Sequence, residues 1–301
     1  MDKLVIALGF FDGVHLGHGA LLRQARATAD RLGCRAAAIT FDRHPSAVIC
    51  GKKTPLITTQ QEREYWIRSL YGIDTVLVLP FDRSMMQLPW QDFLHRCLLP
   101  RFDVCHLVCG WDFRFGYRGE GTAQLLQQEC RRCGIGCDII PEVDFDGVAV
   151  HSTLIRTLLQ QGKIAQAAQF LGHPYSLSGP VVTGKQLGRT IGIPTANLHL
   201  PAQSLQLPQG DYATKVQFDG KTFSAVTNWG RCPTISDHEP LTVESWILDF
   251  SGDLYGKQIR VLFYTMLRKE QQFASLAALQ QTVQENARQT RAYFAAQASP
   301  L

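Results

Sequence analysis

The chain has 301 residues, of which 45 % are hydrophobic and 19 % charged, so it can form two globular domains and is too apolar to be disordered. The formal net charge at pH 7 is +4, and lysine and arginine are scattered, which does not require a nucleic-acid partner. No segment has the roughly 20 apolar residues that span a bilayer, and the N-terminus lacks the cleavage site of a secretion signal. We therefore expect a cytoplasmic protein with small ligands and no membrane or obligate protein partner.

The first part of the chain alternates short apolar runs with amphipathic segments. The apolar runs are bounded by glycine, proline or aspartate, as strands are, and the amphipathic segments have helical spacing. This alternation predicts an α/β domain with a Rossmann-like, doubly wound parallel sheet. We expect strands at 4–10, 35–41, 73–81, 102–110 and 136–143, and helices that include 19–33 and 61–72.

The segment between the first strand and the first helix, FFDGVHLGH at 10–18, is the first candidate site. His15 and His18 would lie at the first helical turn, where unpaired backbone N–H groups and the helix dipole favour an anion. Their spacing of three places both imidazoles on one side, where each can donate a hydrogen bond to a phosphate. Gly13 and Gly17 would let the backbone approach that phosphate. A helix start with incidental histidines is the alternative that H-x-G-H alone leaves open.

The pattern changes near residues 172–178 to successive strands, which predicts a small antiparallel β-barrel and domains at 1–174 and 175–301. Asp219-Gly220 is expected to form a two-residue hairpin turn. A terminal helix at 275–297 should pack on the barrel through Leu276, Leu279, Val283 and Ala287. The expected strands are 177–184, 211–218, 221–228, 241–250 and 258–267.

The run GKQLGRTIGIPTANL at 184–198 is the second candidate site. Its glycines recur every four residues and suggest backbone that wraps a phosphate, but no G-K-[ST] closes a Walker A motif. Hydroxyl and amide oxygens near its end could hold Mg2+, a hard cation. A flexible barrel loop with ordinary turn glycines is the alternative. The residues concerned are Gly184, Gly188 and Gly192, the cations Lys185 and Arg189, and the Mg2+ candidates Thr195 and Asn197.

Nine cysteines, an odd number in a long chain, indicate reduced thiols and not a disulfide framework. The cluster Cys130, Cys133 and Cys137 has partial metal-site spacing, but a four-ligand zinc site would need a matching second pair. We favour thiols at a helix end over a metal site here.

The stretch GFFDGVHLGH at 9–18 resembles the nucleotidyltransferase superfamily, whose members bind ATP or CTP. TFDRHP at 40–45, CGWDFRFG at 109–116 and VHSTLIR at 150–156 resemble the FAD synthetase part of the bacterial bifunctional riboflavin kinase/FAD synthetase family. Independently, Ser152 or Thr153 could cap a helix that carries Arg156. The resemblance implies catalytic roles for His15, His18 and Arg156, ATP binding by Gly9, Phe10, Phe11, Asp12, Gly13, Gly17, Ser152 and Thr153, and flavin binding by His44, Pro45, Asp112 and Phe113.

The second half resembles the riboflavin kinase part of the same family at 184–197, 228–234 and 242–257. This implies Glu244 as the catalytic base, Trp246 at the flavin, Asn228 with Gly184, Lys185, Gly188 and Gly192 at ATP, and Thr195 with Asn197 at Mg2+. In the strand, Glu244 and Trp246 would share one face, opposite Val243 and Ser245. An exposed strand glutamate is the reading that the strand pattern alone favours.

The resemblance implies an enzyme that phosphorylates riboflavin with ATP to FMN and then adenylates FMN with a second ATP to FAD and pyrophosphate. A riboflavin kinase with a degenerate or differently specific first domain is the alternative, because His151, Arg118 and Trp111 depart from the family motifs. A flavin-binding regulator and a tRNA synthetase are less favoured, the latter because no K-M-S-K-S-like loop is found.

Overall fold

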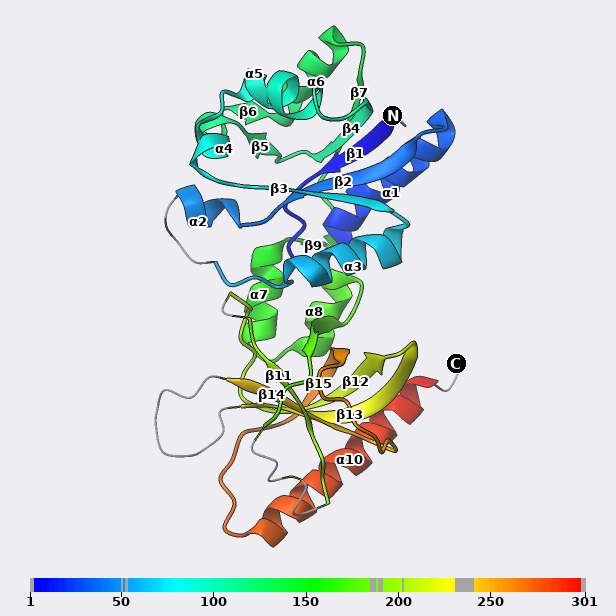
Figure 1. Ribbon diagram of the computed structural model, residues 1–301, viewed down its shortest axis with the longest axis vertical. Helices are drawn as coiled ribbons and strands as arrows, with labels where there is room; N and C mark the ends of the chain where they lie inside the picture. The colour runs from blue at the N-terminus through cyan, green and yellow to red at the C-terminus, as the bar shows by residue number, and fades with distance from the viewer. Residues whose placement is uncertain are drawn as a thin grey trace. The chain divides into compact units, whose positions relative to one another are not determined.

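The computed structural model describes residues 3–49, 51, 54–184, 188, 192–201, 203–230 and 241–298. Internal contacts divide the chain into two units, residues 1–152 and 153–301 (Figure 1). The first unit has a five-stranded parallel sheet, and the second has a six-stranded antiparallel sheet and a terminal helix. Both architectures confirm the predicted fold classes. Among the described residues, every helix is too short or too polar to span a bilayer.

The parallel sheet of the first unit has the strand order β3-β2-β1-β4-β7, so β1 lies at its centre. All five predicted strands are present. Strand β1 pairs on both sides, with Val5 opposite Ala36 and His106. The elements of this unit are β1 (Leu4–Leu8), α1 (Leu16–Leu32), β2 (Arg35–Phe41), α2 (Pro45–Ile49), α3 (Gln60–Tyr71), β3 (Thr75–Leu79), α4 (Arg83–Gln87), α5 (Trp90–Asp92), a π-helix (Phe93–Leu98), β4 (Val104–Gly110), β5 (Arg114–Phe115), a 3-10 turn (Tyr117–Gly119), β6 (Gly121–Thr122), α6 (Ala123–Arg132), β7 (Gly136–Ile140), β8 (Asp144–Phe145) and β9 (Val148–Ala149).

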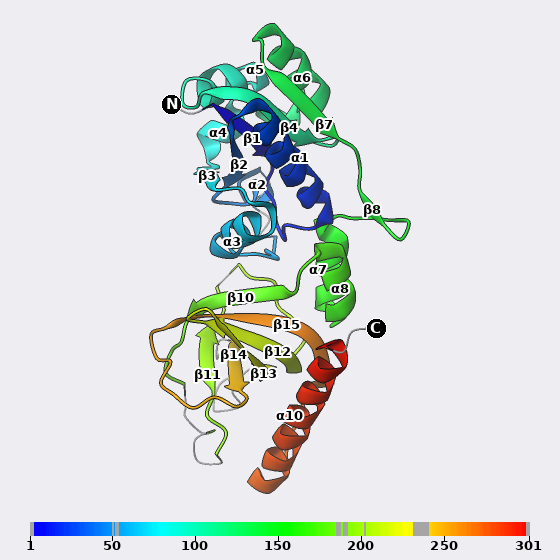
Figure 2. The same cartoon turned by 90° about the vertical axis from the view of Figure 1, so that its right-hand side faces the viewer.

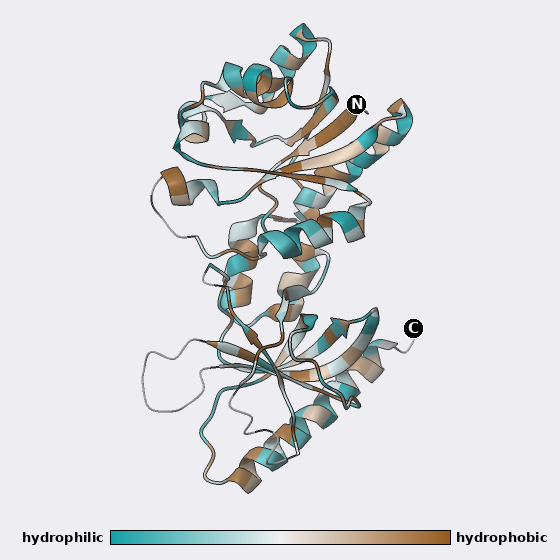
Figure 3. Ribbon diagram, in the orientation of Figure 1, coloured by the Kyte–Doolittle hydropathy of each residue, from teal (hydrophilic) through white to brown (hydrophobic). Residues whose placement is uncertain are grey.

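Helices cover both faces of this sheet, α1 and α3 on one side and α5 and α6 on the other (Figures 1 and 2). The amphipathic helix α1 buries Leu22, Ala25 and Ala29, whose spacing of three and four residues places them on one side. It ends at Gly33, where φ is 64° and glycine costs least. The strands at the sheet centre are hydrophobic along their length, whereas α1 and α3 are hydrophobic on one side only (Figure 3).

The second unit begins with two helices and continues as the antiparallel sheet, in the order β10-β15-β12-β13-β14-β11. A bridge from Val182 to Asn197 joins the chain after β10 to β11, which nearly closes the sheet into a barrel. Asp219 and Gly220 have φ of 48° and 71° and form the predicted hairpin turn. The elements are α7 (Ser152–Gln160), α8 (Ile164–Leu171), β10 (Tyr175–Pro180), β11 (Ala196–His199), β12 (Gly210–Phe218), β13 (Lys221–Gly230), β14 (Thr242–Ile247), β15 (Gln258–Lys269) and α10 (Leu276–Ala298).

Helix α10 packs on the sheet as predicted, but its apolar side differs in part from the predicted one. Leu276 is 65 % exposed, because the first residue of the helix lies beyond the part that contacts the sheet. The buried side includes Asn286, Ala287, Thr290 and Phe294. Two of these four residues are polar, so hydrophobic spacing alone could not identify this side.

Candidate functional site

The first candidate site lies between β1 and α1, where the predicted change from strand to helix is confirmed, although the strand ends two residues before the predicted position 10. Strand β1 ends at Leu8, and α1 begins at Leu16 with His15 as its N-cap. The rings of His15 and His18 stack, with centroids 3.6 Å apart and planes 17° apart. The two imidazoles therefore form one surface at the helix N-terminus, where an anion is favoured.

The two rings differ in their hydrogen bonds, which set the protonated nitrogen of His15. The backbone N–H of His18 donates to Nδ1 of His15 over 3.3 Å, so in the neutral ring the proton of His15 is on Nε2. The Nδ1 atom of His18 is buried and has no hydrogen-bond partner among the described residues. Burial, together with the positive charges that His15 and Arg63 can carry, holds the pKa of His18 well below 6.5. A neutral His18 can still donate one hydrogen bond.

Asp12 lies in the loop between β1 and α1 and is almost fully buried. Its carboxylate accepts hydrogen bonds from the backbone N–H groups of Ile57 and Thr58 over 3.2 and 3.0 Å. The Thr58 hydroxyl in turn accepts the N–H of Gly13, whose φ of 85° places it in the region that favours glycine. This network fixes the backbone under the histidines; the predicted ATP-binding role of Asp12 stays a prediction.

A cavity of about 380 Å³ opens over the two histidines, at the carboxyl ends of the parallel strands. Ligands of open α/β sheets bind at this end. Phe11 and Asp12 lie buried in the loop, and His44 contacts Phe10 edge-on with ring centroids 4.8 Å apart. The predicted residues that line the cavity are Gly9, Phe10, His15, Gly17, His18, Pro45, Asp112, Phe113 and Ser152.

Ser152 and Thr153 are the first two residues of α7, so neither precedes the helix as its cap. The Ser152 hydroxyl donates instead to the carbonyl of Asp12 over 3.0 Å, within the first unit. Thr153 and Arg156 belong to the second unit. Their assignment to the first site stays a prediction.

The second candidate site lies on the antiparallel sheet, where strand register brings three predicted residues into one row. Glu244 on β14 is directly opposite Asn197 on β11 and Asn228 on β13. Directly opposite residues of antiparallel strands project from the same face. Burial alternates along β14, so Glu244 and Trp246 share the less buried face, as predicted.

The glycine-rich run contacts this row at Asn197. A Cβ built on Gly184 would lie 2.8 Å from both Cγ and Nδ2 of the Asn197 amide. That amide is within 3.5 Å of the Thr195 hydroxyl, so the two predicted Mg2+ ligands are neighbours. Gly188 accepts a hydrogen bond from Ile193 over 2.7 Å. Lys185, Arg189 and the residues 231–234 of the motif around Asn228 lie outside the described residues.

A cavity of about 200 Å³ adjoins Thr195 and Asn197 and is bounded by the loop at 250–255. Trp246 packs with Val226, Leu248 and Ala287 in an apolar cluster beside α10. Its predicted contact with flavin stays a prediction.

Comparison with known proteins assigns both units. The FAD synthetase family model matches residues 1–154, and the riboflavin kinase family model matches residues 171–294. The bifunctional riboflavin kinase/FMN adenylyltransferase of Listeria monocytogenes is 34 % identical over 97 % of this chain and 92 % of that protein. The proteins of the same name from Bacillus subtilis and Escherichia coli K12 are 33 % and 35 % identical, each over 97 % of this chain and 93 % of the relative.

The chain belongs to the bifunctional riboflavin kinase/FMN adenylyltransferase family. It has both activities, and its substrates are ATP and flavins. A solved structure described as a macrolide-efflux protein from Streptococcus pneumoniae has a similar fold, with a TM-score of 0.83 and 28 % identity over 96 % of this chain and 94 % of that one. The words macrolide-efflux describe that protein and not this chain.

The adenylyltransferase unit contains a buried cation that the motifs did not indicate. Arg63 on α3 is 1 % exposed and lies with its guanidinium carbon 4.2 Å from the ring centroid of Phe10. Its Nη2 donates to the carbonyl of Phe41, while Nε and Nη1 are buried without a hydrogen-bond partner among the described residues. Burial lowers the pKa of Arg63 to about 10, so it remains charged at pH 7. In the sequence it is one of several charges on an amphipathic helix.

A polar network that the sequence motifs did not indicate continues the Glu244 row of the kinase unit, because Asp211 is directly opposite Asn228. Asp211 on β12 accepts hydrogen bonds from Asn228 over 2.8 Å and from Asn286 of α10 over 2.6 Å. Arg268 forms an ion pair with the same carboxylate at 2.5 Å. Asp211 and Asn286 are 75 positions apart, so only the folded chain shows this link. The network ties the row to α10.

Proposed function

We propose that the two activities reside at two separate sites, adenylyl transfer in the cavity beside His15 and His18 and phosphoryl transfer beside Glu244. The main support is that the histidine pair lies in the first unit and the glutamate row in the second. The histidines stack at one helix start, and Asn197, Glu244 and Asn228 share one row of a different sheet.

Adenylyl transfer needs charge neutralisation more than a base. The FMN phosphate is largely a dianion at pH 7, because its second pKa is about 6. One of its oxygens attacks the α-phosphorus of ATP, the bond from that phosphorus to the bridging oxygen breaks, and pyrophosphate leaves with the electron pair. The Nε2–H of His15, one N–H of His18 and the N-terminus of α1 donate to the polyphosphate as its charge shifts. The buried Arg63, which contacts the ring of Phe10 in this loop, adds positive charge to the field at the polyphosphate. Arg156 is proposed as a further cation for the leaving pyrophosphate.

Phosphoryl transfer has the opposite requirement, because the nucleophile is a neutral hydroxyl of riboflavin. Glu244 accepts the proton of this hydroxyl as its oxygen attacks the γ-phosphorus of ATP, and ADP leaves. Asn228 is opposite Glu244 and is itself held by Asp211, so it can fix a substrate oxygen beside the base. We place the nucleotide phosphates along Gly184, Gly188 and Gly192 and the flavin beside Trp246.

Mg2+ is proposed as the cofactor of the kinase site. Thr195 and Asn197 offer a hydroxyl and an amide oxygen, the hard donors that Mg2+ prefers, and their side chains are neighbours. Mg2+ bound there would neutralise phosphate charge during transfer.

We further propose functional domains at 1–174 and 175–301 and a cytoplasmic location. The riboflavin kinase match begins at residue 171 and β10 begins at Tyr175, which supports this boundary, although α7 and α8 group with the second unit by their contacts. The cysteines among the described residues are free thiols, which supports a reducing compartment.

Two single substitutions test the assignment of each step. Glu244→Gln keeps the shape of the side chain and removes the base, so FMN formation should fall by about 10²- to 10⁴-fold while conversion of FMN to FAD is unchanged. His18→Ala should slow FAD formation and spare FMN formation. Chromatography of riboflavin, FMN and FAD after incubation with ATP and Mg2+ gives both rates. If either substitution stopped both steps in a folded protein, the assignment would be wrong.

A further inference from the structure

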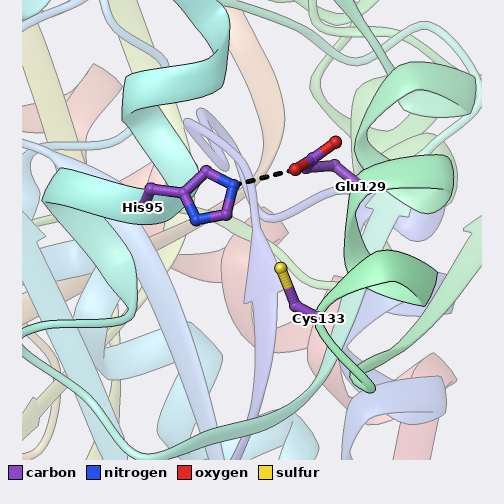
Figure 4. Close-up of side chains that lie close together, drawn as sticks. All are labelled: His95, Glu129 and Cys133. Atoms are coloured by element: carbon purple, nitrogen blue, oxygen red, sulfur yellow. Dashed lines mark hydrogen bonds and ion pairs between the residues drawn. The ribbon is translucent and has the colours of Figure 1, made fainter.

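Three side chains of different chemistry converge in the first unit, away from the cavity. They are His95 on the π-helix, Glu129 on α6 and Cys133 at the C-terminal cap of α6. Their donor atoms, an imidazole nitrogen, a carboxylate oxygen and a thiol sulfur, all lie within 4.8 Å of one another. Figure 4 shows the three side chains pointing toward a common space, with Nε2 of His95 2.9 Å from Oε1 of Glu129.

Local structure accounts for this convergence. Glu129 and Cys133 are four residues apart, so α6 places both on one side. Arg132 donates to Oε2 of Glu129 over 3.0 Å, and this contact leaves Oε1 directed at His95. His95 lies in a π-helical turn, a rare conformation that occurs frequently at functional sites.

The three thiols of the cysteine cluster differ in their neighbours. Cys130 is fully buried in the core, and Cys133 and Cys137 are partly buried and both pack against it. Within the described residues, Cys133 is the only member of the run that joins a group of three metal-type donors. The nitrogen donor of this group, His95, lies on the π-helix, far in sequence from the cysteines, so the cysteine spacing alone could not predict it.

The group is separate from the proposed adenylyl transfer site. Helix α6 leads into the amino end of β7, which begins at Gly136, so Cys133 lies near that end of the strand. The cavity lies at the opposite end, where it is lined by residues 140–143. The side chain of His95 is 42 % exposed and that of Glu129 14 %, so an ion can enter from solvent.

We propose that His95, Glu129 and Cys133 form a site for a transition-metal ion of the zinc class, with water as the fourth ligand. A nitrogen, oxygen and sulfur set suits Zn2+ and Co2+, whereas Mg2+ prefers oxygen alone. Bonds of about 2.0–2.3 Å place tetrahedral ligand atoms about 3.3–3.7 Å apart. The His95 and Glu129 atoms, now 2.9 Å apart, must therefore separate slightly, which rotation of the exposed His95 side chain can achieve.

Binding replaces the His95–Glu129 hydrogen bond by two metal–ligand bonds and adds a third to sulfur. Nε2 of His95 loses its proton to solvent and Nδ1 takes one up, so that Nε2 can bind the ion. The Cys133 thiol releases its proton to solvent as the sulfur–metal bond forms. The ion then links the π-helix to α6. The expected consequence is metal-dependent stabilisation of the first unit.

The test uses the full-length, reduced and metal-free protein without nucleotide, titrated with Co2+ under anaerobic conditions. A thiolate-to-cobalt charge-transfer band should saturate with one ion and be reversed by Zn2+. The band should disappear in Cys133→Ser, and in His95→Ala the affinity should fall by more than about tenfold, since loss of even an outer partner costs that much. His95→Ala changes an exposed side chain and should leave the fold intact.

Cys34→Ser is the matched control, because Cys34 is a partly exposed thiol with its Sγ 3.3 Å from Sγ of Cys105 and could bind cobalt by itself. It should keep the band, and Zn2+ should raise the melting temperature of this variant and of the wild type but not of Cys133→Ser. Loss of the band in Cys34→Ser, its persistence in Cys133→Ser, or its absence from the wild type would overturn the proposal.

Discussion

Asn197 and Glu244 lie directly opposite each other on β11 and β14, which brings the proposed metal ligand and the proposed base to one point of the kinase sheet. Substitution of Asn197 should therefore affect phosphoryl transfer and not adenylyl transfer. Because Asn197→Ala removes an oxygen ligand, we expect at least a tenfold increase in the Mg2+ concentration for half-maximal FMN formation, about the effect of losing an outer partner of a metal site. FAD formation from FMN should show no change. Rates measured across a Mg2+ series check this, and an unchanged Mg2+ dependence of the kinase step would exclude Asn197 as a ligand.

The contact between Gly184 and the Asn197 amide gives a second prediction. A methyl group at position 184 would lie 2.8 Å from Cγ of Asn197, so Gly184→Ala must displace the amide. Displacement of a catalytic group by about 1 Å can cost 10²-fold in rate, and we expect a loss of about this size in riboflavin phosphorylation only.

Gly179→Ala is the control for this substitution. A Cβ on Gly179 meets the side chain of Leu198 at 3.7 Å, an ordinary van der Waals contact. Its kinase rate should stay within a small factor of the wild type. Equal losses in the two variants would show that the effect comes from the sheet backbone and not from Asn197.

The pKa of His18 should depend on nucleotide. Burial and neighbouring positive charge hold the pKa of His18 below 6.5 in the free protein, and a polyphosphate at the ring favours the imidazolium, so ATP should raise it. NMR titration with labelled histidine measures both values, and His18→Gln identifies the signal. A pKa at or above 6.5 without nucleotide, or a fall on ATP binding, would contradict the proposed site.

The same pKa shift has a consequence for stability. Since the folded state disfavours the proton on His18, the unfolded chain binds more protons below its pKa of 6.5. The stability associated with the neutral ring is therefore present above pH 6.5 and lost as the pH falls below it. Urea unfolding at several pH values should show a steeper acid loss in the wild type than in His18→Gln.

Asp12 should contribute mainly to the stability of the adenylyltransferase unit. Asp12→Ala leaves the N–H groups of Ile57 and Thr58 buried without their acceptor, which costs about 1–3 kcal/mol in free energy of unfolding. Asp74→Ala, at an exposed position of the same unit, should change it by less than about 0.5 kcal/mol. Calorimetry of the two variants compares the costs, and equal effects would show that the buried contacts contribute nothing.

The features that could be predicted from the sequence are those set by residues close together along the chain. The strand, turn and helix around His15 and His18 follow from neighbouring residues, and the stacking of their rings follows from a spacing of three. The alternation that places Glu244 and Trp246 on one face is equally local.

Long-range relationships were not accessible in this way. No strand is predicted between 184 and 211, but Ala196–His199 form β11, and only the register of β11 with β14 sets Asn197 beside Glu244. The contact of Asp211 with Asn286 and the burial of Arg63 depend on pairing and packing between distant segments. No local pattern distinguishes these polar residues from surface ones.

The central claim is that two independent sites act in succession. It is tested most directly by mixing two full-length variants, each of which is slowed in a different step. Glu244→Gln and His18→Ala should each produce FAD from riboflavin and ATP only slowly when alone, because each variant is slowed in one step. An equimolar mixture should produce FAD faster than either variant alone, since FMN released by His18→Ala is a substrate for Glu244→Gln. If the mixture formed FAD no faster although each variant was folded and retained its other step, the account of two separate sites linked by free FMN would be contradicted.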